Sequence, residues 1–378
     1  MGAVVAETES PDRSRGARLA VHSAVSTTLA LCSDHRLREL VDAAVPLGSG
    51  IGGQSVLMEV AERPVFVKRV PLTDLEALPE NVRSTANLFG LPAFCQYGIG
   101  AIGHPGFGVW RELAAHIMTT NWVLGDAYQG FPLLYHWRVL PDMSQSLPEE
   151  LADVDRAVAY WGSGPGIRHR IEALGRSSAS VALFLEYIPQ NLHTWLAERM
   201  RTDDANAACS LVERELEAGV SFMNARGLLH FDAHFQNILT DGRRLYFTDF
   251  GLALSSRFEL SQSHADFYDR HRVYDRAHTM TWLVNWLLKD LYDYEREERE
   301  AAVRASARGE RLTGIPGAAA AIIARWAPLA AVVSGFNRTF HEESRETPYP
   351  AEEIHRVSEK YGLAFSADSA GTSAETSR

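Results

Sequence analysis

Three side chains within one short stretch could carry out chemistry together. Asp232 follows a histidine and a phenylalanine, Asn237 lies five residues later, and Asp249 begins an Asp-Phe-Gly motif. Amide and carboxylate oxygens are ligands that Mg²⁺ prefers, so Asn237 and Asp249 are candidate metal ligands. Asp232 comes just before them and could receive a proton from an attacking hydroxyl. This spacing is typical of a catalytic loop for phosphoryl transfer.

A predicted β-hairpin brings the two candidate metal ligands together. Asp241-Gly242 is a strong signal for a type I′ turn, and apolar runs flank it on both sides. Folding residues 237–240 against 243–247 places the amide and the carboxylate at the open end of the hairpin. We therefore expect the site to be built around residues 228–254.

A second stretch, residues 45–70, predicts a phosphate-binding loop. It is read as strand, glycine-rich loop, strand, tight turn at 62–64 and third strand. Glycines let backbone amides approach phosphate oxygens closely. A dinucleotide-binding loop would be followed by a helix, whereas the residues after this loop alternate as a strand does. The candidate loop contacts are Gly48, Ser49, Gly50, Gly52 and Gly53.

Lys68 lies within the apolar third strand of this stretch. Such a lysine is either a solvated edge charge or a functional group with an anionic partner, and the nearby glycine loop favours the second interpretation. Glu112, on a predicted helix, is the favoured partner, although it would otherwise be an exposed helical glutamate. Glu76 and Glu80 are rivals because they are nearer in sequence. Pairing with Glu112 makes residues 71–108 an insertion.

Hydrophobic periodicity predicts the remaining elements. The apolar helix predicted at 274–289 should be buried, with its tryptophans in the core and not in a ligand cage. The predicted elements are a charged helical insertion at 141–178, a buried strand at 180–188, helices at 191–200, 211–226 and 274–289, a charged segment at 295–311 and a helical region at 318–362.

Composition restricts the partners and the compartment. The chain has 378 residues and a net charge of −11, which argues against nucleic acid or an anionic membrane as a partner. Three scattered cysteines and the absence of a recognisable signal peptide predict a cytoplasmic protein. The apolar stretch 318–336 contains Arg325 and Pro328, so we expect a buried helix and its neighbour rather than a membrane span.

The order of these motifs resembles the protein-kinase-like superfamily over roughly residues 45–290. The resemblance implies an α+β, two-lobed fold with a small β-rich N-lobe and a larger helical C-lobe. The expected organisation is an N-terminal extension at 1–35, an N-lobe at 36–190 that contains both insertions, a C-lobe at 191–365 and a disordered tail at 366–378.

The resemblance also implies a role for each matching residue. ATP and Mg²⁺ would be the cofactors, and Asp232 would be the catalytic base. Gly48, Gly50 and Gly53 would cover the ATP phosphates, and Lys68 would hold the phosphates and pair with Glu112. Asn237 and Asp249 would bind Mg²⁺, His230 would brace the catalytic loop, and Phe250 would pack against the helix of Glu112. The connector, formed by Glu186, Tyr187 and Ile188, would read adenine through its backbone.

Departures from the regulated protein-kinase pattern affect the expected substrate. Phe231 and His234 stand where Ser/Thr kinases have arginine and lysine, and no Ala-Pro-Glu motif follows Asp249. The motif form is closer to the aminoglycoside and choline phosphotransferases and to atypical bacterial kinases. We expect transfer of the γ-phosphate of ATP to a hydroxyl of a small molecule or of a protein serine or threonine. The alternatives are a nucleotide-binding pseudokinase scaffold and a kinase-fold AMP transferase.

Overall fold

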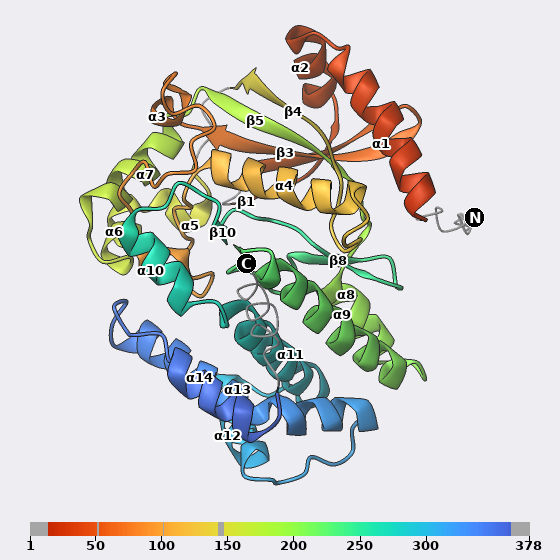
Figure 1. Cartoon of the computed structure of the whole chain (residues 1–378), viewed down its shortest axis with the longest axis vertical. Coiled ribbons are helices and arrows are strands. Elements are labelled where there is room, and N and C mark those ends of the chain that lie inside the picture. Colours follow the sequence, from red (N-terminus) through yellow and green to blue (C-terminus); the bar gives the residue numbers. More distant parts are fainter. Residues whose placement is uncertain (1–13, 51–52, 101, 143–146, 364–378) are drawn as a thin grey trace, which may run out of the picture.

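The computed structural model describes residues 14–50, 53–100, 102–142 and 147–363. These residues form a mixed α+β structure. An antiparallel sheet occupies one end of the molecule, and a group of helices occupies the other (Figure 1).

The main sheet has five strands in the order β1-β2-β3-β5-β4, and every neighbouring pair is antiparallel. Its central strand, β3, carries Lys68, which pairs with Ser55 on β2 and Leu183 on β5. The strands of this sheet are β1 (Val45–Gly50), β2 (Gly53–Val60), β3 (Arg63–Leu72), β4 (Leu134–Pro141) and β5 (Ala179–Glu186). Short strands form two small sheets: β6 (Gln190–Asn191), β7 (Leu228–Leu229), β8 (Ile238–Thr240), β9 (Leu245–Phe247) and β10 (Leu254–Ser255).

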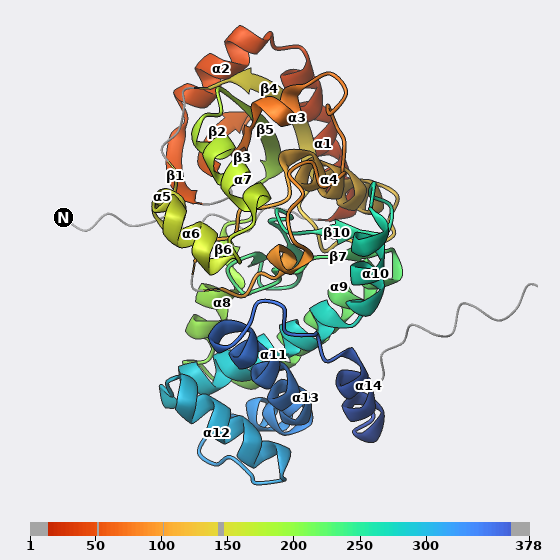
Figure 2. The same ribbon diagram turned by 90° about the vertical axis from the view of Figure 1, so that its left-hand side faces the viewer.

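Helices flank the sheet and make up the other end of the molecule (Figures 1 and 2). Those before residues 228–254 are α1 (Arg15–Ala30), α2 (Asp34–Asp42), α3 (Asp74–Ala77), the 3₁₀ helix η1 (Ala93–Gln96), α4 (Val109–Leu124), α5 (Glu149–Ala152), α6 (Val154–Tyr160), α7 (Pro165–Gly175), α8 (Leu192–Arg199) and α9 (Ala205–Ala225). Those after these residues are α10 (Gln262–Arg270), α11 (Tyr274–Tyr292), α12 (Arg296–Ala307), α13 (Gly317–Glu342) and α14 (Ala351–Lys360).

The turn between β2 and β3 lies earlier than the sequence suggested. Val60 pairs with Arg63, so the turn residues are Ala61 and Glu62, both with positive φ, instead of residues 62–64. Positive φ at both central positions is the geometry of a type I′ turn, whose twist matches that of the flanking strands. The strand register, which alternates apolar residues toward the core, outweighs the turn preference of Pro64.

The first two helices pack on the sheet. Ser14 and Ser33 cap the N-termini of α1 and α2 by accepting backbone hydrogen bonds. Helix α1 lies along β4, at the right-hand side of Figure 1, and α2 also contacts β4. Residues 15–30, which the sequence assigned to an N-terminal extension, are thus an integral layer over the sheet.

One continuous helix, α13, replaces the predicted pair in the C-terminal region. It runs through Pro328 without a break. Proline normally interrupts a helix because it removes one hydrogen bond and crowds the preceding turn. Here ten or more helical residues on each side, packed against α9, α11, α12 and α14, hold the helix in place. Among the described residues, α13 is also the one helix long and apolar enough to span a membrane, but 56% of that window is buried within the protein.

Candidate active site

The hairpin between Asn237 and Asp249 forms, but with a different turn from the one predicted. Thr240 pairs with Leu245, so the connection has four residues, 241–244, and is not a two-residue type I′ turn. Asp241 Oδ1 accepts hydrogen bonds from the backbone amides of Arg243 and Arg244, each at 3.0 Å. An aspartate that caps its own turn in this way competes with the type I′ geometry.

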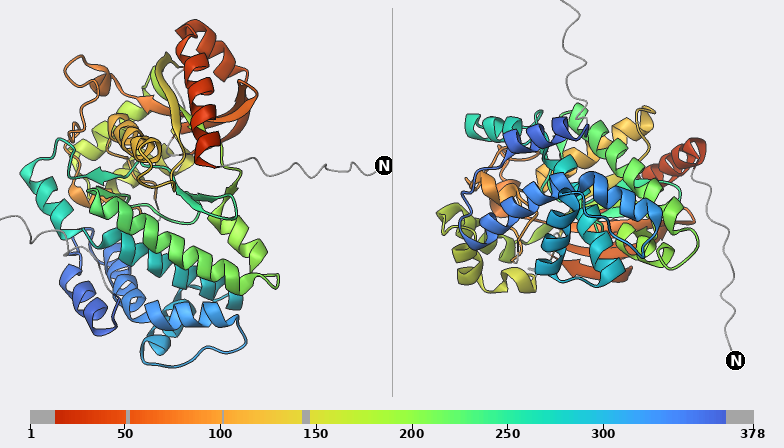
Figure 3. Two further views of the ribbon diagram at one scale, coloured as in Figure 1. Left: turned by 45° about the vertical axis from the view of Figure 1, so that its right-hand side comes forward. Right: turned by 90° about the horizontal axis from the view of Figure 1, so that it is seen from below.

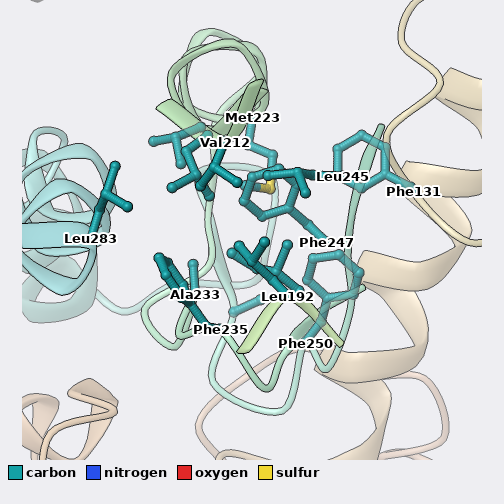
Figure 4. Close-up of a cluster of buried hydrophobic side chains, with 14 of the residues drawn as sticks. Phe131, Leu192, Val212, Met223, Ala233, Phe235, Leu245, Phe247, Phe250 and Leu283 are labelled. Atoms are coloured by element: carbon teal, nitrogen blue, oxygen red, sulfur yellow. The ribbon is translucent and has the colours of Figure 1, made fainter. Parts of the chain in front are cut away.

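The open end of the hairpin holds the candidate metal ligands, as expected. The backbone N–H of Thr248 donates to the carbonyl of Asn237 at 3.1 Å, which places Asn237 beside the residue preceding Asp249. Buried side chains of the hairpin, including Leu245 and Phe247, pack against Val212 and Met223 of α9 (Figure 4). This packing fixes the hairpin, and therefore both ligands, on the helical part of the molecule.

Lys68 contacts its predicted partner Glu112 and also the candidate metal ligand Asp249. Its Nζ lies 2.7 Å from Glu112 Oε1 and 2.9 Å from Asp249 Oδ1. The predicted Lys68–Glu112 pair is therefore confirmed. The rival Glu76 is buried elsewhere, where it pairs with Arg170 at 2.8 Å and accepts a hydrogen bond from the Val109 amide at the start of α4.

Lys68 and Asp249 stabilise each other's charge. Burial alone would lower the pKa of Lys68, but the negative charges of Asp249 and Glu112 outweigh it and hold that pKa above its usual value. Burial alone would raise the pKa of Asp249, yet Lys68 keeps that pKa well below its usual range. For Glu112, burial dominates and raises the pKa in spite of Lys68. Lys68 and Asp249 are therefore charged at neutral pH.

Asp232 lies beside Asn237, at the open end of the hairpin. Asn237 Nδ2 donates to Asp232 Oδ2 at 3.0 Å and to the Asp232 carbonyl at 3.1 Å. This leaves the amide oxygen of Asn237 as its candidate metal ligand. Burial, followed by the negative charge of Asp249, raises the pKa of Asp232 well above its usual value. A cation beside Asp249 would reduce that repulsion and lower this pKa.

His230 braces the loop through both ring nitrogens, as the resemblance implied. Its Nε2 lies 2.9 Å from the carbonyl of Thr248, and Nδ1 lies 3.3 Å from the amide of Asp232. A carbonyl can only accept, so Nε2 carries the proton and Nδ1 accepts. Burial lowers the pKa of His230 to about 4, which keeps this neutral tautomer at physiological pH.

The loop has a second anchor, Asp275 on α11, that the sequence did not reveal. Its carboxylate accepts the backbone amides of His230 at 2.6 Å and Phe231 at 2.8 Å. Phe231 has a φ of 63°, a strained value for a bulky residue, so the loop needs such an anchor. The sequence offers one signal for this anchor, namely an aspartate within a helix whose other residues are mostly apolar.

Phe250 of the Asp-Phe-Gly motif also meets its expected neighbour. It is fully buried, and its ring lies 5.0 Å from that of His116 on α4, the helix that carries Glu112. Its ring is equally close to His230. Phe250 therefore packs between the helix that carries Glu112 and the loop that carries His230 and Asp232.

The glycine-rich segment is a hairpin between two strands, as predicted. Gly50 pairs with Gly53, and Ser49 pairs with Gln54. Gly53 has a φ of 108°, and a Cβ there would collide with the carbonyl of Arg69, so only glycine fits. Gly52 lies outside the described residues. Gly48, paired with Ser55, follows an irregularity in β1.

Two groups of Glu186, the first residue of the expected connector, are engaged within the protein. Its carboxylate is 7% exposed and forms an ion pair with Arg18 of α1 at 2.7 Å. Its amide donates to the carbonyl of Leu133 at 2.8 Å. Both groups therefore stabilise the protein itself and do not face a ligand. Tyr187 and Ile188 follow directly, and Ile188 is buried.

Further side chains reach the site from parts of the chain that the motifs do not include. A cavity beside Asp232 is lined by Gly98 and Ile99 and by a face of α11 that includes His278 and Trp282. Trp282 is 44% exposed, so the prediction that the tryptophans of this helix are core residues is wrong for Trp282, although it holds for the buried Trp286. When a helix is apolar nearly all round, its sequence does not show which of its faces lines a cavity.

The donor set fits Mg²⁺ bound in the manner of nucleotide enzymes. Among the described residues, no group of three or more His, Cys, Asp or Glu side chains could hold a metal by itself. Asn237 and Asp249 would supply two oxygen ligands, and Mg²⁺ commonly takes one or two protein ligands and completes its shell with phosphates and waters.

Comparison with known proteins adds no family assignment. No protein-family model matches the chain, and no curated protein matches its sequence.

Proposed function

We propose that the protein is an ATP- and Mg²⁺-dependent phosphotransferase with a two-lobed, protein-kinase-like fold. The observation that carries this proposal is the position of Lys68. It bridges Glu112 and Asp249 across the boundary between the sheet and the catalytic hairpin, and its charge also acts on Asp232, which Asn237 contacts. A buried lysine held by two carboxylates beside a candidate base is an arrangement that phosphoryl transfer uses.

In this proposal the chain mainly positions charge. Lys68 and the amides of the glycine loop bind the phosphates of ATP. Asn237 and Asp249 hold Mg²⁺, which offsets the phosphate charge. Asp232 orients the acceptor hydroxyl and takes its proton late in the transfer. Most of the acceleration then comes from alignment and electrostatic stabilisation and not from a covalent intermediate.

The acceptor is a hydroxyl of a small molecule or of a protein side chain, and the compartment is the cytoplasm. The residues that line the cavity beside Asp232 include two aspartates and neither lysine nor arginine. An anionic acceptor would meet the negative charge of these aspartates there, so a neutral or cationic one fits best. The motif form at Phe231 and His234 favours relatives of the small-molecule phosphotransferases and the atypical bacterial kinases.

Thermal stability with Mg-ATP tests the proposal directly. We expect Mg-ATP to raise the Tm of the wild type, since a ligand that binds only the folded state stabilises it. Asp249→Ala should remove most of that shift, and Asp232→Ala should keep it. If Mg-ATP does not raise the Tm of the wild type, the nucleotide proposal is wrong.

Turnover separates the three candidate activities. Incubation with γ-labelled or α-labelled ATP, a metabolite pool and a cell lysate shows which label is transferred. γ-Label on a product, lost in Asp232→Ala, supports the kinase. Transfer of the α-label supports AMP transfer, and binding without transfer of either label supports a nucleotide-binding scaffold.

A further inference from the structure

The segment between the lysine strand and α4 crosses the front of the candidate active site. We call residues 93–100 and 102–107 the strap. In Figure 2 its orange chain lies between the sheet and α11. The sequence marked this region only as an insertion, with no role.

The strap touches the candidate base through a glycine. A Cβ on Gly98 would lie far inside van der Waals contact of the Asp232 carboxylate, and 2.9 Å from the Phe231 carbonyl. The backbone of the strap is therefore packed directly against Asp232. The cavity that remains there is about 10 Å³, room for about one water molecule.

A second strap residue lies at the lysine end of the site. The charges of Asp249, Lys68 and His234 act on His104, and burial lowers the pKa of that imidazole to about 4. Its Nδ1 is buried and has no hydrogen-bond partner among the described residues. The strap thus extends from Asp232 at Gly98 to the surroundings of Asp249 at His104.

Hydrogen bonds hold the strap on the helical side. The side-chain amide of Gln96 donates to the carbonyl of Leu252, just after the Asp-Phe-Gly motif. The hydroxyl of Tyr97 lies 2.6 Å from His271 Nε2. His271 Nδ1 faces the Phe267 carbonyl at 2.6 Å and must carry the proton, so the Tyr97 hydroxyl is the donor.

The second insertion holds the strap from the outside. Trp161 Nε1, after α6, donates to the carbonyl of Gly103 at 2.9 Å, and Arg170 of α7 donates to the carbonyl of Pro105 at 3.2 Å. Buried apolar residues of the strap and of α6 and α7 share one cluster with Phe231 and Tyr274. The two insertions therefore form one unit whose inner surface is the strap.

We propose that the strap is the acceptor-side wall of the site and that it must lift from Asp232 before any acceptor larger than water reaches the carboxylate. Gly98 sets how closely the wall closes. This inference rests on the proposed function, because it takes Asp232 as the group that receives the acceptor. An organic hydroxyl needs a heavy-atom distance of about 2.6–3.2 Å from its base. Gly98 packs against the Asp232 carboxylate, and the Asp232 side chain is only 16% exposed.

Chemical access to Asp232 measures the position of the strap without ATP or acceptor. The full chain is treated with a carbodiimide and glycine ethyl ester, and modification of Asp232 is quantified by peptide mass spectrometry. Hydrogen–deuterium exchange of the strap amides is followed in parallel. In the wild type we expect slow labelling of Asp232 and slow exchange of the strap.

Gly98→Ala should force the strap away from Asp232 and increase both rates on the order of tenfold, since overpacking a filled contact displaces the backbone. Gly164→Ala is the matched control. Its new Cβ meets only ordinary contacts, the nearest 3.5 Å away, in the neighbouring insertion. Both rates in the control should equal those of the wild type.

Tyr97→Phe is the second variant, for the case in which Gly98→Ala does not fold. Loss of its hydrogen bond to His271 should raise both rates about 2- to 10-fold. Tyr292→Phe, which loses a hydrogen bond to Thr313 far along α11, serves as its control and should change neither rate. Rapid labelling of Asp232 in the wild type, or unchanged rates in a folded strap variant, overturns the strap proposal. The Mg-ATP experiments remain independent of either result.

Discussion

At the scale of single residues, the candidate site depends on which carboxylate meets Lys68. Glu112 and Glu76 are both buried, and sequence distance favours Glu76. Their environments decide the matter, because Glu76 is already engaged by Arg170 and by the N-terminus of α4. One glutamate therefore holds a candidate functional charge, while the other holds the insertions and the start of α4 together.

This division of roles predicts that the same substitution weakens nucleotide binding at Glu112 and lowers stability at Glu76. Glu112→Gln leaves Lys68 with a neutral partner, and we expect the Kd for Mg-ATP to rise about 10- to 100-fold, the size of one lost charge-assisted hydrogen bond. Glu76→Gln should lower the free energy of unfolding by about 1–3 kcal/mol because Arg170 loses its buried partner. Calorimetric binding and urea unfolding of both variants measure the two effects. Equal effects of the two variants on binding would contradict the assignment of Glu112.

At the scale of elements, the hairpin reaches its position because α9 lets it come close. A Cβ at Gly219 would overlap the ring of Phe247, so β9 packs directly on the helix backbone (Figure 3 shows α9 running beneath the sheet). The order of Asn237, the turn and Asp249 could be predicted because turn and strand signals are local. The four-residue turn and the unbroken α13 could not, because side-chain capping at Asp241 and packing around Pro328 decide them.

Gly219→Ala should displace β9 and with it Asp249. We expect a loss of about 1–3 kcal/mol in the free energy of unfolding from overpacking, together with a smaller Tm shift on adding Mg-ATP. Gly335→Ala on α13 is the matched control, since its Cβ would meet no atom within 4 Å. That control should be neutral or stabilising by up to about 1 kcal/mol, as alanine favours helix more than glycine does. A tolerated Gly219→Ala would show that α9 does not set the position of the hairpin.

At the scale of the whole molecule, motif spacing identified the charged residues of the site but not what surrounds them. Lys68, Asp232, Asn237 and Asp249 belong to two continuous stretches, so local patterns sufficed to group them. Gly98, Asp275 and Trp282 reach the site only after the chain has folded, and no spacing links them to Asp232. Their roles depend on tertiary packing, which a single sequence does not encode in any local pattern.

The molecule should lose stability as the pH falls from 7.5 to 5. Five buried histidines have pKa values that burial lowers to about 3 or 4: His116, His230, His264, His271 and His278. Because the folded pKa is below the unfolded one, each contributes stability above pH 6.5 that is lost as the pH falls toward the folded value. Each such proton changes the free energy of unfolding by about 1.4 kcal/mol per pH unit.

Three carboxyls act in the opposite sense. The pKa values of Glu112, Asp232 and Asp275 are raised, that of Asp275 to about 6 and all three chiefly by burial, so their protonation favours the folded state as the pH falls. Because five histidines outweigh three carboxyls, the free energy of unfolding should increase with pH over this range. Urea unfolding at several pH values measures this increase, and His264→Gln should reduce it. Stability that stays constant from pH 7.5 to 5 would refute this prediction.

The ion pair between Arg18 and Glu186 has a consequence for where the functional unit begins. Arg18 also donates to the carbonyls of Gln129 and Phe131, at 3.0 and 2.6 Å, so one N-terminal side chain joins α1, the loop before β4 and the end of β5. A version of the protein shortened to residues 45–290 would leave the buried Glu186 carboxylate and two carbonyls without the Arg18 guanidinium, next to the junction between the sheet and the helices. The autonomous folding unit therefore starts upstream of the glycine loop, at α1.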